Sequence, residues 1–289
     1  MVEGRGDSDP HRALSKKEMK LIRLLLVGFI LTLLIFGVQS KQAARSSVFP
    51  TASRTLRVMT YNIHVGIGMD KKLDLQRIAD VINRQHPDLV GLQEVDRGVK
   101  RTQQMDEIAE LAKLTRMDYA FAHNLDYQGG QYGVAILSRS LLKNVEHQMF
   151  ANKREAERRG MLRVEIEVDG KVVNFVTTHL DYQYEDGRVF ETEQLLKFLE
   201  PVQGPLIVVA DMNDEPTGAA YKLMRSKFED AWVASHAKDE GFSYPADKPI
   251  KRIDHIFYRD GFKAKKASTV QTLASDHVPV VAELQLILP

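Results

Sequence analysis

The sequence contains no cysteine among its 289 residues. This absence excludes disulfide bonds, thiolate metal sites and cysteine nucleophiles, so any bound metal must use oxygen or imidazole ligands. The sequence also lacks internal repeats and low-complexity tracts, and its composition, 44% hydrophobic and 27% charged, is typical of a folded protein. A chain of this length can bury a sizeable core, and it fits one large α/β domain.

A strong excess of charge of either sign is also missing, because the formal net charge is only +1. Residues 1–55 hold nine Lys and Arg against four Asp and Glu, which leaves residues 56–289 with a net charge of −4. There is no long run of basic residues beyond the pairs Lys153-Arg154 and Arg158-Arg159. We therefore do not expect the broad basic surface with which proteins grip long nucleic acids.

One apolar segment stands out near the N-terminus. Leu24 to Val38 is uncharged, extends to residues 21–38 across Arg23, and follows Lys16, Lys17 and Lys20. This pattern predicts a signal anchor or a cleavable signal peptide. We favour an uncleaved anchor with the basic segment 1–20 in the cytoplasm and the rest of the chain on the extracytoplasmic side, whereas cleavage would give a secreted protein. Residues 39–55 are polar and predict a linker, and residues 56–289 predict a single domain.

The domain alternates between strand and helix patterns without a second break in composition. Alternating or short apolar runs predict strands, and helical spacing of apolar residues predicts two helices, the first with Asp74 as its N-cap. The predicted strands are 56–61, 89–92, 134–137, 162–168, 172–178, 206–209, 253–258 and 278–286. The predicted helices are one that follows Asp74 and stops before Pro87, and one over residues 188–199. Strands outnumber helices and include a hairpin at Asp169-Gly170, so we expect an α/β sandwich of mixed sheets.

Polar side chains lie at the ends of most predicted strands. Each one alone is more often a turn former or a helix cap, but together they supply carboxylates, carboxamides and imidazoles. If the strand ends converge, this set suits Mg²⁺, Mn²⁺ or Ca²⁺ and the activation of a water molecule for attack on phosphorus. The residues concerned are Asn62, His64, Glu94, His179, Asp181, Asp211, Asn213, Asp214, Asp254, Asp276 and His277.

Seven short motifs in this order resemble the endonuclease/exonuclease/phosphatase superfamily. The resemblance covers residues 56–289 and implies a four-layered α/β sandwich of two mixed β-sheets flanked by helices, preceded here by one N-terminal hydrophobic helix. It also implies a divalent-metal-dependent phosphoesterase. The motifs are Tyr61-Asn62-Ile63-His64, Gln93-Glu94-Val95-Asp96, Tyr132 to Arg139, Thr178-His179-Leu180-Asp181, Asp211-Met212-Asn213-Asp214, Arg252-Ile253-Asp254-His255-Ile256 and Ser275 to Val280.

The resemblance also implies roles for individual residues. Glu94 would be the principal metal ligand, with Asn62 and Asp276 beside it. Asp211 would orient or deprotonate the attacking water, Asn213 would hold that water or the phosphate, and His179 would donate to a non-bridging oxygen. His277, oriented by Asp254, would contact the scissile phosphate, because a carboxylate partner raises the pKa of an imidazole and fixes its tautomer. Arg159 is our candidate for phosphate binding, with a solvated surface position as the alternative, and Tyr132 and His64 are candidates for supporting residues around it. Asp96, Asp181 and Asp214 are expected to be caps or loop formers.

The substrate is less constrained than the reaction. The segments between motifs are short, residues 124–131 are expected to form a small loop, and the body of the protein is mildly acidic. Some motifs also resemble a subgroup related to proteins that remodel glycosylphosphatidylinositol lipids. We therefore expect a monomeric phosphodiesterase or phosphatase that acts on lipid-linked or small-molecule esters and contacts the membrane through its N-terminal segment. The alternative is an exported nuclease that acts on DNA or RNA. A degraded member that only binds a partner is disfavoured, because the full set of polar residues is present.

Overall fold

The computed structural model describes residues 15–17, 19–20 and 54–287. The chain divides into two units, Met1–Thr51 and Ala52–Pro289, and the second contains the sheets. Its strands are β1 (Thr55–Asn62), β2 (Leu89–Arg97), β3 (Asp118–Tyr127), β4 (Gly130–Ser138), β5 (Lys143–Met149), β6 (Gly160–Val168), β7 (Lys171–His179), β8 (Leu206–Asp211), β9 (Glu229–Asp230), β10 (Asp254–Arg259), β11 (Phe262–Thr269) and β12 (Val280–Leu286). Its α-helices are α2 (Leu75–Gln85), α3 (Glu107–Thr115), α4 (Glu185–Leu199), α5 (Ala219–Arg225) and α6 (Ala231–Ala234).

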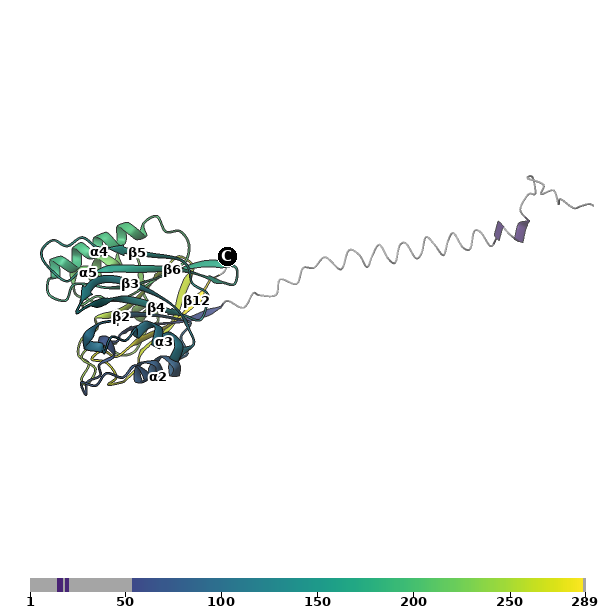
Figure 1. The fold of residues 1–289 in the computed structure, drawn as a ribbon. Coiled ribbons are helices and arrows are strands. Elements are labelled where there is room, and N and C mark those ends of the chain that lie inside the picture. Colours follow the sequence, from purple (N-terminus) through teal and green to yellow (C-terminus); the bar gives the residue numbers. More distant parts are fainter. Residues whose placement is uncertain (1–14, 18, 21–53, 288–289) are drawn as a thin grey trace, which may run out of the picture. The chain divides into compact units, whose positions relative to one another are not determined.

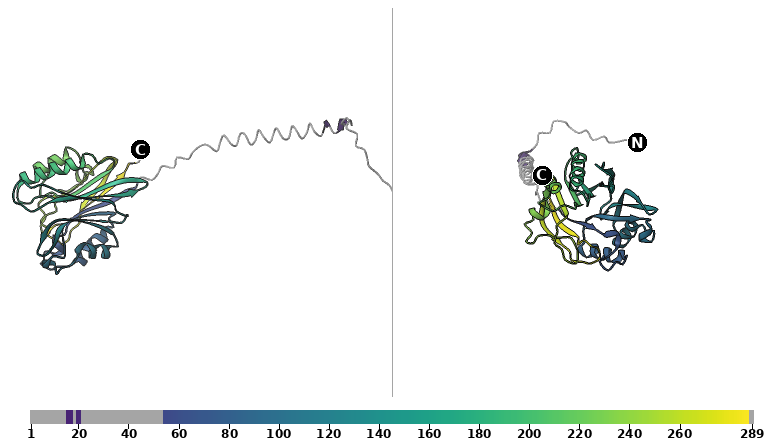
Figure 2. Two further views of the ribbon diagram at one scale, coloured as in Figure 1. Left: turned by 45° about the horizontal axis from the view of Figure 1, so that its top comes forward. Right: turned by 90° about the vertical axis from the view of Figure 1, so that its left-hand side faces the viewer.

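The strands form two six-stranded sheets that pack face to face. The first has the order β11-β12-β1-β2-β4-β3, and the second has the order β5-β6-β7-β8-β10-β9. Each sheet is mixed, with one parallel pair near its centre: β1 with β2 in the first sheet and β7 with β8 in the second. Helices α2 and α3 cover the outer face of the first sheet, and α4 and α5 cover that of the second (Figures 1 and 2). The predicted four-layered α/β sandwich of two mixed sheets is confirmed.

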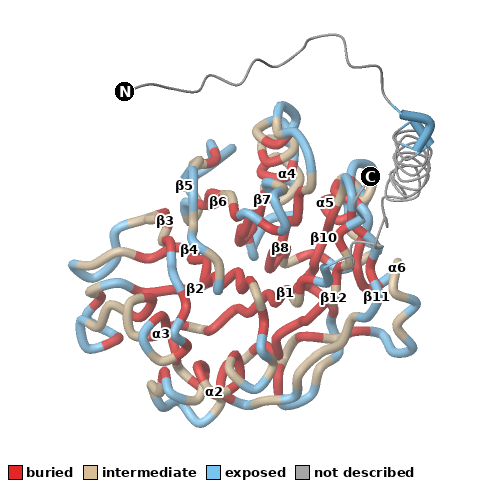
Figure 3. Tube along the Cα trace, turned by 90° about the vertical axis from the view of Figure 1, so that its right-hand side faces the viewer, coloured by how far each residue is buried: buried red, intermediate tan, exposed pale blue. Residues whose placement is uncertain are grey.

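The sandwich has three apolar layers, which explains why its central strands read as continuous apolar runs. In β8, Ile207 and Val209 face the other sheet, whereas Leu206 and Val208 face α4 and α5. In β1, Val58 likewise lies between the sheets. Successive side chains of a strand point to opposite faces, so a strand covered on both faces needs apolar residues throughout. The buried parts of the chain follow these central strands (Figure 3).

The two predicted helices are present, and their ends follow from local chemistry. Asp74 is the N-cap of α2, and its carboxylate accepts a hydrogen bond from the backbone N–H of Arg77. Helix α4 begins at Glu185, three residues before the predicted start at residue 188.

The predicted small loop at residues 124–131 is instead the tip of a hairpin. Strand β3 runs to Tyr127 and β4 starts at Gly130, so only two residues form the turn. Several side chains of β3 are polar and partly exposed, which hid the strand in the sequence.

The predicted N-terminal features lie largely outside the described residues. These features are the basic segment 1–20, the apolar segment 21–38 with its hydrophobic helix, and nearly all of the linker 39–55. None of the helices within the described ranges is long and apolar enough to cross a membrane.

Gly91 lies where the two sheets approach too closely for a Cβ atom, and this gives a prediction about stability. A Cβ atom at this position would lie 2.2 Å from Cγ2 of Val209 and 2.8 Å from Oγ1 of Thr177. Gly91→Ala should therefore lower the free energy of unfolding by about 1–3 kcal/mol through overpacking, as measured by chemical denaturation. Val209→Ala removes the nearest atom. The double variant Gly91→Ala/Val209→Ala should therefore lose less unfolding free energy than the sum of the losses in the two single variants. Additive losses would contradict this explanation.

Candidate active site

The parallel strand pairs of the two sheets end close together, and their last residues form the site. The register of β1 with β2 ends at Asn62 and Gln93, and that of β7 with β8 ends at His179 and Asp211. Across the sheets, Nδ2 of Asn62 donates to Oδ2 of Asp211 at 2.9 Å. Asp254, the first residue of β10, is paired with Asp211. The carboxyl ends of β1, β7 and β8 and the amino end of β10 therefore aim their side chains at one region. The opposite end of β1 pairs with the end of β12, away from this region.

A β-bulge in β2 positions Glu94. The register with β4 shifts between Leu92 and Val95, and Glu94 has a φ of 55°, in the left-handed region that L-residues rarely adopt. Its Oε1 accepts a hydrogen bond of 2.9 Å from Asn62 Nδ2. His64 and Asn213, which line the same cavity, also have positive φ, at 45° and 48°. Such strained backbone is common at functional sites.

Glu107 supports the end of this bulged strand and gives a prediction about pH. Its buried carboxylate accepts from the backbone N–H of Asp96 at 2.7 Å, and burial raises its pKa to about 8. The folded state therefore keeps a proton that the unfolded state releases above its ordinary pKa of 4.5, so this group destabilises the fold as pH rises towards 8. As the pH rises from 6 to 8, the unfolding free energy of Glu107→Gln should increase by about 1–2 kcal/mol relative to that of the wild type. Glu110→Gln, on the same helix but with a side chain 40% exposed, is the matched control. An equal gain in both variants would contradict this explanation.

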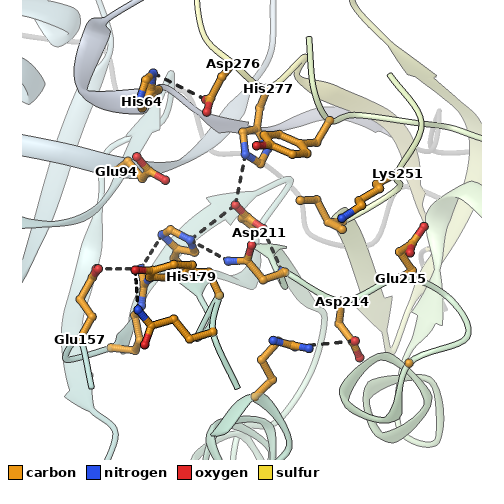
Figure 4. A pocket seen from close by; sticks show the side chains of 18 of the residues that line it. His64, Glu94, Glu157, His179, Asp211, Asp214, Glu215, Lys251, Asp276 and His277 are labelled. Atoms are coloured by element: carbon orange, nitrogen blue, oxygen red, sulfur yellow. Dashed lines mark hydrogen bonds and ion pairs between the residues drawn. The ribbon is translucent and has the colours of Figure 1, made fainter. Parts of the chain in front are cut away.

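The strand ends open into a cavity of about 1240 Å³ (Figure 4). Nine of the eleven residues predicted at the site line it: His64, Glu94, Tyr132, Arg159, His179, Asp211, Asn213, Asp276 and His277. The other two, Asn62 and Asp254, lie directly behind this wall and hydrogen-bond to Asp211 and His277, respectively.

Asp211 lies at the centre of the hydrogen-bond network. Its Oδ1 accepts from the backbone N–H of Asn213 at 2.9 Å, and its Oδ2 lies 3.5 Å from Nε2 of His179 and 3.7 Å from Nε2 of His277. Its side chain is buried, and this burial together with the charge of Asp254 raises the pKa of Asp211 to about 7. A carboxylate with such a pKa can accept a proton near neutral pH.

His277 and Asp254 form a buried pair beside Asp211. Nδ1 of His277 lies 2.8 Å from Oδ2 of Asp254, and the ring of Tyr244 packs against the imidazole with centroids 4.8 Å apart. Burial alone would lower the pKa of His277, but the charges of Asp254 and Asp211 outweigh it and raise this pKa to about 10. His277 is therefore a cation at neutral pH that can donate to a phosphate oxygen.

His179 has the opposite character, although it lies on the other side of the same carboxylate. Burial and the charges of Arg159 and His277 lower its pKa well below the ordinary value. The imidazole is neutral, so its 3.5 Å contact with Asp211 is not an ion pair. Tyr132 is also buried, and its raised pKa, due to burial and the charge of Glu94, keeps the phenol protonated as a donor.

Two groups of side chains in this region could hold a divalent cation. Asp211, Asp254 and His277 offer ligand atoms within 4.8 Å of one another. However, Asp254 and His277 are hydrogen-bonded to each other, and His277 is cationic. Glu94 and Asp276 are the better donors, because both line the cavity and no Lys or Arg within residues 54–287 forms an ion pair with either. Carboxylate oxygens of this kind fit Mg²⁺, Mn²⁺ or Ca²⁺.

Asn62 bridges two carboxylates of the site through its side-chain amide. Its amide nitrogen donates to Glu94 and Asp211, while its Oδ1 accepts from the backbone N–H of His64 at 3.0 Å. In this orientation Asn62 holds the two carboxylates in place, and direct metal ligation would require the amide to turn over.

Some residues of the site were not predicted. Glu157 and Tyr244 lie in irregular segments, where no periodicity marks a side chain as buried or aimed at a cavity. Three further aspartates were predicted as caps or loop formers, and each accepts a hydrogen bond from a residue nearby in the sequence. Asp96 accepts from the guanidinium of Arg101, Asp181 from the backbone N–H of Gln183, and Asp214 from the backbone N–H of Tyr221.

Comparison with known proteins agrees with this geometry. Residues 59–277 match the family model of the endonuclease/exonuclease/phosphatase family. A family protein from Bacteroides thetaiotaomicron superposes with a TM-score of 0.67 at 20% identity, covering 82% of this chain and 99% of that one. The human Nocturnin catalytic domain gives 0.64 at 20% identity, covering 80% and 93%. A mannosyl-6-phosphatase from Bacteroides thetaiotaomicron gives 0.65 at 19% identity, covering 79% and 99%. No curated protein sequence matches this chain.

The chain belongs to the endonuclease/exonuclease/phosphatase family. It is accordingly a hydrolase that cleaves phosphoester bonds with the help of a divalent metal.

Proposed function

We propose that the enzyme hydrolyses phosphate esters of small or lipid-linked molecules. The observation that carries this proposal is the charge of the cavity. Seven carboxylates line it, against one lysine and three arginines. Each arginine is already paired with a carboxylate: Arg101 with Asp96, Arg159 with Glu157 and Arg188 with Asp214.

Among the residues described, Lys251 is therefore the only lysine or arginine of the cavity without a carboxylate partner within 4.0 Å. A nuclease that grips a nucleic acid strand uses several Lys and Arg side chains to neutralise successive phosphates. This cavity suits a single phosphate group attached to a molecule with hydrogen-bonding groups, because carboxylates accept from hydroxyls.

The chemistry assigns separate tasks to the residues of the site. Glu94 and Asp276 would hold the cation, which when bound supplies positive charge to the phosphate, and Asn62 fixes the orientation of Glu94. Asp211 takes the proton of the attacking water. His277, whose Nδ1 is bonded to Asp254, donates to the phosphate through Nε2, and neutral His179 donates to a non-bridging oxygen.

The N-terminal segment adds a location to this proposal. Residues 21–38 would anchor the enzyme in a membrane with the catalytic domain on the extracytoplasmic side, and the domain would act as a monomer. Mass spectrometry of the mature N-terminus tests the anchor, because cleavage near Ser40 would release the enzyme instead.

A substrate panel tests the proposed function. The full chain with Mg²⁺ or Mn²⁺ is incubated with phospholipid headgroup esters, sugar phosphates, plasmid DNA and RNA, and released product is measured. We expect hydrolysis of at least one small or headgroup ester, with the activity lost in EDTA and in Asp211→Asn. Nicking of the plasmid at low enzyme concentration, without hydrolysis of the small esters, would instead identify an exported nuclease.

A further inference from the structure

Arg159 is one of the most deeply buried charged side chains of the domain, and it contacts an imidazole. It is 2% exposed, and its Nη1 lies 2.7 Å from Nδ1 of His179. The same nitrogen lies 3.1 Å from Oε1 of Glu157. The guanidinium is therefore held between a carboxylate and a catalytic histidine at the wall of the cavity.

This contact determines where the proton of His179 lies. A guanidinium is always protonated and only donates hydrogen bonds, so Nδ1 of His179 must be the acceptor. A neutral imidazole carries one N–H, and the proton is consequently on Nε2. The low pKa of His179, caused by burial and by Arg159, agrees with a ring that carries a single proton.

The Nε2 nitrogen then faces a second donor. Nδ2 of Asn213 lies 3.0 Å from it and also donates to the carbonyl of Leu180 at 3.0 Å. If Nε2 instead accepted from Asn213, the proton on Nδ1 would face the charged guanidinium at 2.7 Å. The latter conflict costs more, because hydrogen bonds of charged donors are about twice as strong as neutral ones.

Two N–H groups at this spacing cannot satisfy each other, but one oxygen can accept from both. Oδ2 of Asp211 lies 3.5 Å from Nε2, too far for a strong hydrogen bond, so an anionic oxygen on the cavity side of Nε2 and Nδ2 could accept from both groups. Donors arranged before the substrate arrives are the most effective way to stabilise charge that develops in a transition state.

We propose that Arg159 is a positioning residue that holds His179 with its proton on Nε2, so that His179 and Asn213 together bind one non-bridging phosphate oxygen. This inference rests on the proposed hydrolysis of phosphate esters. It replaces direct phosphate binding as the role of Arg159, because its contacts are with His179 and Glu157. Glu157 compensates the buried charge and keeps the guanidinium in place.

Nuclear magnetic resonance of ¹⁵N-histidine-labelled full-length protein tests the proton position directly. Long-range ¹H–¹⁵N correlations distinguish the two neutral tautomers, and His179→Gln identifies the signals among the nine histidines. We expect the Nε2–H form in the wild type. Arg159→Met should move His179 towards the Nδ1–H form, which Asn213 can then pair as donor to Nε2. Arg101→Met, which removes another arginine of the same cavity, is the control and should leave the tautomer unchanged.

Kinetics on whichever ester the wild type hydrolyses provides the second measurement. Arg159→Met should lower kcat by about 100-fold or more with a smaller change in KM, because a wrong tautomer removes a donor needed in the transition state. Arg159→Lys keeps a donor near Nδ1 and should recover part of kcat. If Arg159→Met does not fold, the double variant Glu157→Gln/Arg159→Met removes both buried charges and serves in its place.

The inference is overturned by a wild-type His179 with its proton on Nδ1, or by a tautomer that Arg159→Met leaves unchanged. A higher KM with unchanged kcat in Arg159→Met would also overturn it and would indicate direct substrate binding by Arg159. The tautomer measurement needs no substrate, so it stands even if the panel of esters shows that the proposed function is wrong.

Discussion

Asp211→Asn should lower kcat by about 10⁴-fold or more while the protein remains folded. Asn has the same shape, but it cannot take a proton from water, and general base catalysis alone is worth about 10²–10⁴ in rate. Asp211 is also the residue that His179 and His277 approach from both sides, at 3.5 and 3.7 Å, and its charge attracts the cationic ring of His277. The measurement is single-turnover hydrolysis at saturating cation.

Two controls make this result specific. Asp214→Asn removes another carboxylate of the same cavity, one that bonds the backbone N–H of Tyr221, and should retain kcat within about tenfold. Thermal unfolding of Asp211→Asn should show at most a small loss of stability, because removing a buried charge offsets the hydrogen bond from Asn62 that an amide nitrogen cannot accept. Activity of Asp211→Asn close to that of the wild type would contradict its role as base.

Glu94→Gln should weaken the apparent affinity for the divalent cation by about 10- to 100-fold or more and reduce activity at fixed Mg²⁺ correspondingly. The substitution replaces a charged oxygen ligand with a neutral amide at a carboxylate that no Lys or Arg of the described chain neutralises. Calorimetric titration with Mg²⁺ and Mn²⁺, together with activity as a function of cation concentration, measures the effect.

The same experiment separates the two candidate sets of metal ligands. Glu215→Gln, an exposed carboxylate at the rim of the cavity, is the matched control and should leave cation affinity unchanged. If Glu94→Gln binds the cation normally while Asp254→Asn does not, the ion lies instead at Asp211, Asp254 and His277, whose ligand atoms are close together.

The sequence predicted the location of most site residues because their positions follow from strand patterns. Asn62, His179 and Asp211 come directly at the ends of apolar strands, and the carboxyl ends of the parallel pairs lie side by side in the fold. The family resemblance supplied the expected role of each residue. The central strands were also predicted correctly, since burial on both faces makes them continuously apolar.

The remaining features depend on contacts that no local pattern records. Strand β3 was missed because its polar, partly exposed residues resemble a loop, and the pairing with β4 makes it a strand. The position of Arg159 beside Nδ1 of His179 arises from the packing of β6 against β7, and its neighbour Glu157 lies in an irregular segment. Sequence spacing alone cannot show whether an arginine points at a substrate or at a neighbouring side chain.

The direction of β1 has a consequence for how the enzyme would reach its substrate. The chain enters the sandwich at Thr55 and reaches the cavity at Asn62, roughly 23 Å further on at the rise of an extended strand. An attachment upstream of Thr55 would thus join the domain at the end opposite to the opening of the cavity. Sixteen residues, 39–54, can span up to roughly 55 Å when extended. Their length would therefore set the maximum distance between the attachment point and the catalytic domain. With the proposed anchor at residues 21–38 in a bilayer, shortening this connection should restrict access to substrates in that bilayer while leaving dissolved esters unaffected.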